Sequence, residues 1–271
     1  MSPVEIAVNG ETVPTNGYLQ WHARRIALTA ALLERLGARR IVELGGHPWV
    51  MTALLLDRPH VELTATVSVE EKTLWPDDVG VTTSENVIRT PAGREHRVTN
   101  YSANLERRLF DVHPRPDTVL ACEIVEHLIR APHVMFLNVN RWLPVGGKLV
   151  ITTPNGSQFS NPLRRKSASP AYRHNAYERH AFLYTLDDLV DLVTLCGFRI
   201  TETALWDPYP RSGLSGIYGV LGRLPGRYLR EKFRKTIVVV AEKERDVTML
   251  PRAPKVCDAR GDWEYVARRA P

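Results

Sequence analysis

The sequence contains little cysteine and no long hydrophobic segment. Its three cysteines, Cys122, Cys196 and Cys257, lie far apart and follow no metal-binding spacing. We therefore expect neither a disulfide framework nor a zinc site, and a reducing compartment such as the cytoplasm is favoured. No apolar run approaches the roughly 20 residues that a transmembrane helix needs. The first residues, MSPVEIAVNG, lack the basic start and apolar core of a secretory signal.

The chain length and composition are those of a globular protein. The 271 residues, 44% of them hydrophobic, suffice for one large α/β domain with appendages. The formal net charge is +6. This excess is compatible with an anionic partner such as a phosphate-bearing acceptor, nucleic acid or a membrane surface. A solvated surface with a mild basic excess is the simpler interpretation, and we expect no nucleic acid partner.

The most informative stretch is residues 117–155, DTVLACEIVEHLIRAPHVMFLNVNRWLPVGGKLVITTPN. An apolar run is followed by a helical pattern, which a Pro-Val-Gly-Gly turn ends at 144–147. A second apolar, β-branched run then ends at Pro154. This order predicts a βαβ unit with two parallel, buried strands. Ligands of such sheets bind at the carboxyl ends of the strands, which places Cys122 and Glu123 beside any site.

Four blocks of this stretch resemble the second half of a class I S-adenosylmethionine (SAM)-dependent methyltransferase. The family pattern reads FDxVxxxEVxEHL and later LKPGGxLxxTTPN, and the blocks here are DTV, EIVEHL, LPVGGK and TTPN. Residues 179–185, followed by a helix start and Gly197-Phe198, resemble the RHNREYTxxEL…GF pattern of the branch that methylates glycans and natural products. The resemblance implies a seven-stranded Rossmann-like sheet, mostly parallel with one antiparallel strand, that binds SAM and releases S-adenosylhomocysteine (SAH).

The resemblance covers about residues 38–243 and divides the chain into three parts. These are an N-terminal arm with a cofactor-closing helix at 1–37, the methyltransferase domain at 38–243 with insertions at about 72–94, 156–178 and 207–234, and a peripheral tail at 244–271. Apolar patterns predict helices over 18–36, 50–56 and from 186, a continuous helical segment over 124–142, and strands over 40–44, 61–68, 95–98, 118–122, 148–153, 198–204 and 235–243. Residues 1–14 are expected to form a short strand or a loose arm.

The turn after the first strand is half of a SAM-binding motif. Glu43 matches the acid that contacts the amino end of SAM, directly or through water. Gly45 and Gly46 match a turn in which glycine lets the backbone approach the ligand. His47 and Trp49 stand where further glycines are usual.

Other cofactor contacts are implied at the ends of the next two strands and on the first helix. Strand 61–68 ends in Ser68 where the family has an acid for the ribose hydroxyls, and Glu70 is the nearest carboxylate after it. Asn104 and the backbone of Leu105 match the residues that recognise adenine; an ordinary Asx turn is the alternative. Tyr18, or an arginine of the same helix, is a candidate partner of the SAM carboxylate; a solvated helix face is equally compatible.

Two histidines are candidates for the general base. His127 lies four residues after Glu123, so we expect both on one helix face. It is either a base, because imidazole exchanges protons near neutral pH, or a structural residue that orients a glutamate. His180 precedes a helix with the N-cap Thr185, and it is either the base or substrate orienter, or a structural hydrogen-bonding residue.

The predicted reaction is a direct displacement that moves the methyl group of SAM to a hydroxyl or amine, with base assistance. The branch resemblance favours a small acceptor such as a sugar, glycan or secondary metabolite, which can be anionic. One alternative is a quinone or lipid methyltransferase at a membrane, because residues 228–235 form a basic amphipathic stretch. Another is a SAM-fold scaffold without catalysis. The first strand is not followed by GxGxxG, which argues against a nicotinamide dehydrogenase, and no metal cluster is evident.

Overall fold

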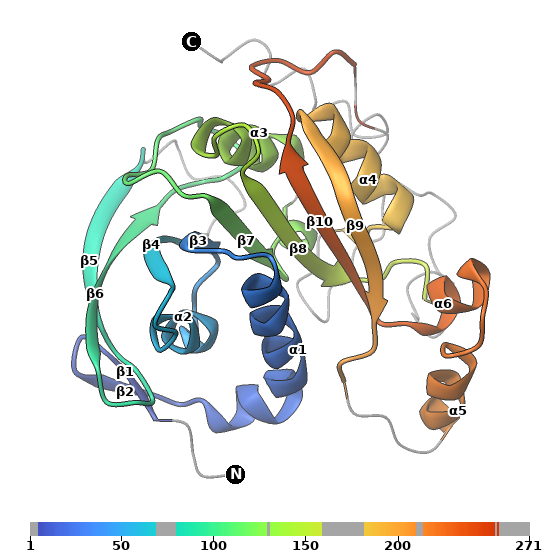
Figure 1. Cartoon of the computed structure of the whole chain (residues 1–271), viewed down its shortest axis with the longest axis horizontal. Coiled ribbons are helices and arrows are strands. Elements are labelled where there is room, and N and C mark those ends of the chain that lie inside the picture. The colour runs from blue at the N-terminus through green and yellow to red at the C-terminus, as the bar shows by residue number, and fades with distance from the viewer. Residues whose placement is uncertain are drawn as a thin grey trace.

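The computed structural model of the chain describes residues 5–68, 80–128, 131–158, 182–209, 214–252 and 254. One mixed sheet runs through this part of the chain, with helices on both of its faces (Figure 1). The strands are β1 Ile6–Val8, β2 Glu11–Val13, β3 Arg40–Leu44, β4 Glu62–Ser68, β5 Thr82–Arg89, β6 Glu95–Ser102, β7 Thr118–Cys122, β8 Lys148–Pro154, β9 Phe198–Trp206 and β10 Thr236–Lys243. The helices are α1 Asn16–Arg35, α2 Val50–Leu56, α3 Pro132–Trp142, α4 Leu186–Leu195, α5 Leu214–Leu221 and α6 Arg227–Phe233, with a 3-10 turn, η1, at Val125–His127.

The strand order is β2-β1-β5-β6-β4-β3-β7-β8-β10-β9. Neighbours from β6 to β8 pair in parallel, whereas β10 pairs antiparallel with both β8 and β9. These seven strands are the predicted mostly parallel sheet with one antiparallel strand. The predicted total of seven is wrong, because β5, β1 and β2 extend the sheet beyond β6 to ten strands in the described residues.

The extension covers what would otherwise be an exposed edge. β5 and β6 form an antiparallel hairpin whose turn is closed by a hydrogen bond from the Thr90 N–H to the Arg94 carbonyl at 2.8 Å. Asn9 then joins the arm to β5, since its N–H donates to the Val87 carbonyl and its side chain accepts from the Val87 N–H. Pairing these strands satisfies backbone groups that an unpaired edge would leave exposed.

The helical segment expected over 124–142 is interrupted. A single 3-10 turn, η1, is followed by α3, which begins at Pro132. Proline suits the first position of a helix, because its missing N–H has no partner there, but it cannot continue one. Glu123 has a φ of 55°, outside any helix. The prediction that Glu123 and His127 share a helix face is therefore wrong.

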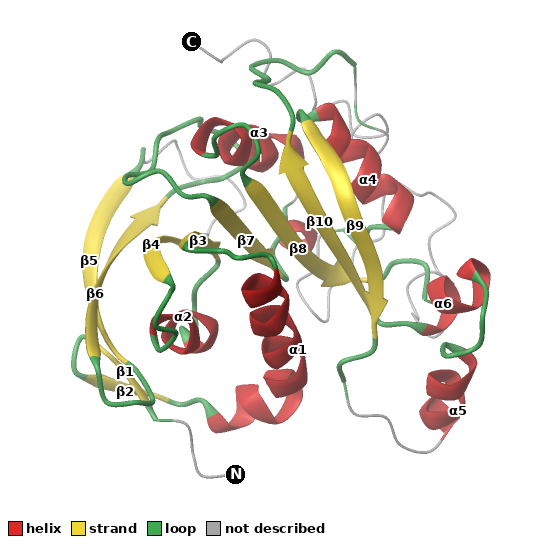
Figure 2. Cartoon of the chain, viewed as in Figure 1, coloured by secondary structure: helices red, strands yellow, loops and turns green. Residues whose placement is uncertain are grey.

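Helices lie on both faces of the sheet (Figure 2), and two apolar layers fill the space between sheet and helices. Alternate residues of β3 point to opposite faces, with Val42 and Leu44 in one layer and Ile41 in the other. The first layer contains the buried faces of α3 and α4, and the second contains those of α1 and α2. The central strands are buried on both sides, as parallel strands between helices usually are.

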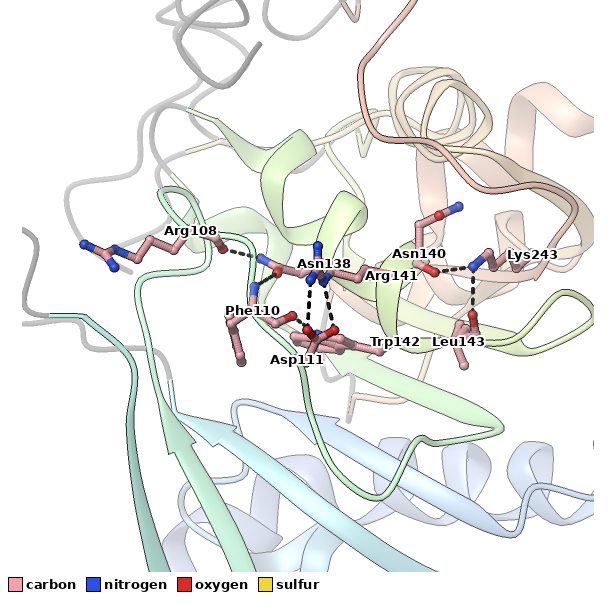
Figure 3. A network of polar contacts seen from close by, with 9 residues as sticks. All are labelled: Arg108, Phe110, Asp111, Asn138, Asn140, Arg141, Trp142, Leu143 and Lys243. Atoms are coloured by element: carbon pink, nitrogen blue, oxygen red, sulfur yellow. Dashed lines mark hydrogen bonds and ion pairs between the residues drawn. The ribbon is translucent and has the colours of Figure 1, made fainter. Parts of the chain in front are cut away.

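A polar network locks α3 to the loop before β7 (Figure 3). The Asn138 side chain accepts a hydrogen bond from the Phe110 N–H at 2.9 Å and donates to the Arg108 carbonyl at 2.7 Å. The Trp142 indole donates to the Phe110 carbonyl at 2.7 Å. Because each of these backbone groups is paired, the loop is positioned by directional contacts as well as by apolar packing.

The end of α3 is fastened to β10 by a buried lysine (Figure 3). Lys243 is 3% exposed, and its ammonium donates to the carbonyls of Asn140 and Leu143 at 2.6 and 2.8 Å. These carbonyls belong to the last turn of the helix, where a cation also complements the helix dipole. A third contact, to the carboxylate of Asp246 at 2.6 Å, completes the site.

Candidate functional site

The carboxyl ends of β3, β7 and β8 meet beside α1 (Figure 1). The structure brings three of the expected site residues together here, since the charge of Arg25 on α1 acts on Glu43, Cys122 and Tyr18. Tyr209, on the segment that leaves β9, joins them. The sequence motifs placed the strand ends in one site, whereas the contribution of Tyr209 carried no sequence signal.

Arg25 is the central charge of this site. It is 3% exposed, and its guanidinium donates to the Tyr18 hydroxyl at 3.0 Å. Burial acts to lower the pKa of Arg25, but the nearby charges, that of Glu123 first among them, together outweigh it and hold the pKa above its usual value. The buried Nε has no hydrogen-bond partner among the described residues. A buried cation with an unused donor is costly, so the site is suited to an anionic ligand group.

The His22 ring packs against two tyrosine rings near Arg25. Its ring centroid lies 4.4 Å from that of Tyr18 and 5.6 Å, edge to face, from that of Tyr209. Burial, and next the charge of Arg25, lower the pKa of His22 to about 4, so its imidazole is neutral near pH 7. Its buried Nδ1 has no partner in the described part of the chain. Tyr18, His22 and Arg25 follow a spacing of four and three, the signal by which one helix face can be read from sequence.

The turn after β3 is tightly packed. Glu43 is 3% exposed, and burial raises its pKa to about 7 although Thr52 and Arg25 act in the opposite direction. Gly45 has a φ of 71°, and a Cβ there would lie 2.0 Å from the Ile124 Cδ1. Trp49 adopts a φ of 67°, so it has the left-handed backbone that glycine adopts most easily.

Gly46, the other glycine of the turn, is also closely packed. A Cβ there would approach Thr66 Cγ2 at 3.2 Å and Thr52 Oγ1 at 3.3 Å. Both glycines are therefore packed against neighbouring side chains of the protein, and Trp49 stands where a later glycine is usual. Both glycines lie directly after β3, at the carboxyl edge of the sheet.

Two glutamates are oriented by consecutive threonines of β8. The Thr152 hydroxyl donates to Glu123 Oε1 at 2.9 Å, and the Thr153 hydroxyl donates to Glu126 Oε2 at 2.9 Å. Burial, and next the charge of Glu123, hold the pKa of Glu126 well above its usual value, which favours the protonated carboxyl. Its buried Oε1 has no partner in the described residues. Glu126 was not among the predicted site residues, although its spacing from Glu123 within the EIVEHL block was a signal.

The other predicted site residues differ in burial and in their partners. His127 is half-buried in η1. Burial raises the pKa of the Cys122 thiol to about 11, so it stays protonated. The backbone of Ser68 pairs with Ser102 at the end of β4, while Glu70 and His180 lie outside the described residues.

Asn104 follows β6 at the edge of the sheet. Its side-chain oxygen accepts a hydrogen bond from the Glu106 N–H at 2.9 Å, which is an Asx turn. The side chain is exposed, and the next residue, Leu105, is 1% exposed in the core. Asn104 thus occupies the expected strand end with its carbonyl oxygen already engaged.

Asn155, the last residue of the TTPN block, connects β8 to the helices that follow β9. Its side-chain amide donates to the carbonyls of Glu231 and Arg234 at 2.8 Å each, at the end of α6. Its carbonyl oxygen accepts from the Ser157 N–H at 2.9 Å. The motif therefore also fixes the position of α6 against the carboxyl edge of the sheet.

Within the residues that the structure describes, no group of three or more histidine, cysteine, aspartate or glutamate side chains is arranged to hold a metal ion. The helices described there include none whose length and apolar character would allow it to span a membrane.

No protein-family model and no curated protein sequence matches the chain. Solved structures do. A chain of the complex between the Haloferax volcanii Trm112 methyltransferase activator and a protein assigned as a methyltransferase matches with a TM-score of 0.50 and 12% identity, over 83% of this chain and 92% of that one. The methyltransferase domain of a bacterial Hen1, CtHen1, matches with a TM-score of 0.50 and 15% identity, over 82% and 98%.

A protein of Galdieria sulphuraria, assigned as a sarcosine dimethylglycine methyltransferase, matches with a TM-score of 0.50 and 13% identity, over 83% of this chain and 86% of that one. Identities this low establish the fold and leave the acceptor open. Strands β6 to β9, with one reversed strand, form the mostly parallel sheet that the sequence predicted. The chain therefore has the fold of the class I SAM-dependent methyltransferases.

Proposed function

We propose that the protein is an enzyme that binds SAM and transfers its methyl group to a hydroxyl, or an amine, of a small molecule. SAM supplies an electrophilic methyl group on its sulfonium sulfur, and the neutral thioether SAH is the leaving group. The protein's task is to hold donor and acceptor in line and to accept or direct a proton. A cytoplasmic location is part of the proposal, supported by the free thiols of Cys122 and Cys196.

The observation that carries the cofactor assignment is the buried guanidinium of Arg25. Its unused Nε, at the carboxyl edge of the sheet, is suited to the carboxylate of the methionine part of SAM. Glu43 is close enough for its charge to be felt by Arg25 and is assigned to the amino group. Gly45 and Gly46 are assigned to the turn that contacts the methionine part of SAM. Ser68, Glu70, Asn104 and Leu105 keep their proposed contacts to the ribose and adenine.

Two buried polar atoms support a hydroxyl-bearing acceptor. His22 Nδ1 and Glu126 Oε1 have no partner in the described structure, and both groups neighbour Tyr209, whose pKa is raised by burial and by the surrounding glutamates. A protonated Glu126 can donate a hydrogen bond, and a neutral His22 can accept one. Because a pKa near 4 makes His22 a weak base, we assign it to binding. His127 and His180 remain the proposed bases.

Calorimetry with SAM and SAH tests the cofactor assignment. We expect the wild-type protein to bind both, and Arg25→Met to weaken binding about 10- to 100-fold, because a hydrogen bond to a charged group contributes about 1.5–3 kcal/mol. Arg24→Met is the matched control, since Arg24 is the exposed neighbour on the same helix. Wild-type protein that binds neither compound would overturn the proposal.

SAH release from SAM in the presence of pooled acceptors tests catalysis. We expect turnover with hydroxyl-bearing metabolites and its loss in His127→Ala or His180→Ala with SAM binding retained. Retained SAM binding without transfer to any small molecule or RNA would instead identify a scaffold. Turnover on RNA alone would contradict the small-molecule assignment.

A further inference from the structure

The helices α5 and α6 carry an unusual exposed apolar surface. Seven large hydrophobic side chains are exposed in the described residues, and four of them lie in this one segment. They are Ile217 at 56%, Val220 at 60%, Leu224 at 43% and Tyr228 at 70% exposure. Aliphatic side chains scattered singly over a surface are ordinary, whereas four within twelve residues of sequence form a patch. We call residues 214–235 the α5–α6 surface.

This surface is also strongly basic. In sequence, six of residues 214–235 are Arg or Lys and only Glu231 is acidic, a formal charge of +5 out of +6 for the whole chain. Among the described side chains, Arg223 and Arg230 are exposed. The ammonium of Lys232 lies 5.5 Å from the centre of the Tyr228 ring. The mild overall charge of the protein thus comes almost entirely from the segment with the exposed apolar side chains.

The α5–α6 surface is held in a defined position. Asn155 holds the carbonyls at the end of α6, as described above. The Arg234 guanidinium donates to the Gly222 carbonyl at 2.8 Å and so ties α6 to the turn after α5. The two helices lie beyond the ends of β9 and β10, on the outside of the sheet (Figure 1). The apolar side chains are therefore presented outward by a fixed unit and have no core to join.

A groove of about 530 Å³ lies at the base of this unit. Its walls come from α4, β9 and α6, and include Leu186, Val190, Ile200, Leu205 and Arg230. The lining also contains Thr203 and the carboxylates of Asp187 and Glu231 beside Arg230, so the groove has a mixed surface and does not by itself define a ligand.

The combination of charge and apolar exposure selects one partner. Basic side chains alone would suit phosphates of any source, including nucleic acid. Phosphate binding would, however, leave the apolar side chains of Ile217 and Val220 exposed to water. A bilayer that contains anionic lipid satisfies both, because the apolar side chains enter the acyl boundary while the cations pair with headgroups. We infer that the α5–α6 surface docks the protein on an anionic membrane.

Docking would place the site next to the lipid. Tyr209 and Asn155 connect the site to the two ends of the segment that holds the surface, since Tyr209 precedes α5 and Asn155 holds α6. An acceptor dissolved in the membrane would therefore reach the protein at the same edge of the sheet. The docking itself depends only on the α5–α6 surface and does not require SAM.

Sedimentation with sucrose-loaded vesicles tests the inference on the full chain. We expect at least tenfold stronger partitioning onto vesicles of phosphatidylcholine with phosphatidylglycerol than onto phosphatidylcholine alone, and weaker partitioning as salt is raised. The double variant Ile217→Ser/Val220→Ser should lose binding about tenfold or more. Val145→Ser/Met249→Ser is the matched control, because these side chains are 65% and 63% exposed elsewhere in the chain.

Two arginine variants, one on the α5–α6 surface and one elsewhere, complete the test. Arg223→Gln should weaken binding and its salt dependence, whereas Arg97→Gln, an exposed arginine on β6, should not. Equal binding to both vesicle types, or equal losses in both double variants, would overturn the inference. The inference would also be overturned if the wild-type protein bound no vesicles and light scattering showed that it is a dimer. In that case Ile217→Ser/Val220→Ser, but not the control double variant, would convert the dimer to a monomer. SAM calorimetry on the same samples separates these outcomes from failure of the cofactor assignment.

Discussion

The Thr52 hydroxyl donates a 2.5 Å hydrogen bond to the carboxylate of Glu43. This contact joins the end of β3 to α2 across the turn between them. In this turn His47 and Trp49 replace two glycines that are usual in the SAM-binding motif. Glu43 is nonetheless buried enough that its pKa is raised to about 7. A carboxyl that is half protonated near neutral pH makes both stability and ligand binding depend on pH.

We expect Glu43→Gln to remove part of the pH dependence of stability. The folded pKa of about 7 exceeds the ordinary value of 4.5, so between these pH values the folded protein holds a proton that the unfolded chain has lost. The free energy of unfolding therefore falls as pH rises through this window, by on the order of 3 kcal/mol for this residue. Urea unfolding between pH 4.5 and 8 measures the effect.

Glu62→Gln is the control for this experiment, because Glu62 is exposed at the start of β4. It should leave the pH profile of the wild-type protein unchanged. Unfolding curves of Glu43→Gln that keep the full wild-type slope would show that Glu43 does not titrate in this range. Glu126, whose pKa is also raised, contributes a slope of the same sign in all three proteins.

Gly45→Ala should be much more damaging than Gly146→Ala. Both glycines have positive φ, 71° and 84°, so either substitution costs about 1 kcal/mol of backbone strain. Only the new methyl group at position 45 collides with Ile124, which adds about 1–3 kcal/mol and moves the turn. Urea unfolding and SAM calorimetry would measure both effects. Equal losses of stability in the two variants would contradict the close packing of the turn.

Asn155→Ala should loosen α6 without unfolding the sheet. The substitution leaves two helix-end carbonyls without their donor, at a cost of about 2 kcal/mol. Trypsin should then cleave after the arginines of residues 223–234 several-fold faster than in wild type. Asn86→Ala is the control, because it removes an exposed side-chain contact on β5. Unchanged proteolysis of Asn155→Ala would exclude the proposed anchoring.

Thr185→Ala should destabilise α4 by about 1 kcal/mol, because Thr185 and Asp188 form a complete capping box. The Thr185 hydroxyl accepts from the Asp188 N–H at 3.1 Å, and the Asp188 carboxylate accepts from the Thr185 N–H at 3.0 Å. Thr194→Ala, at the exposed end of the same helix, should be neutral or slightly stabilising. Thermal unfolding distinguishes the two, and equal melting temperatures would argue against the cap.

Local sequence patterns determined the central elements of this protein. The strand over 40–44, the helix over 50–56 and the N-cap at Thr185 were all predicted from neighbouring residues. Each depends on apolar periodicity, on glycine at a turn or on a capping side chain, and these act within a few residues. The order of the motif blocks was likewise enough to predict the seven strands from β6 to β9.

Tertiary structure alone decided the edge of the sheet and the composition of the site. β5, β1 and β2 extend the sheet because Asn9 and Val87 pair across a large sequence separation, which no local pattern encodes. The left-handed backbone of Glu123, with a φ of 55°, keeps it out of the turn that holds His127, and the close approach of α1 and the segment after β9 placed Tyr209 beside His22. The raised pKa of Glu126 arises from burial, and burial is a property of the folded packing and not of any one segment.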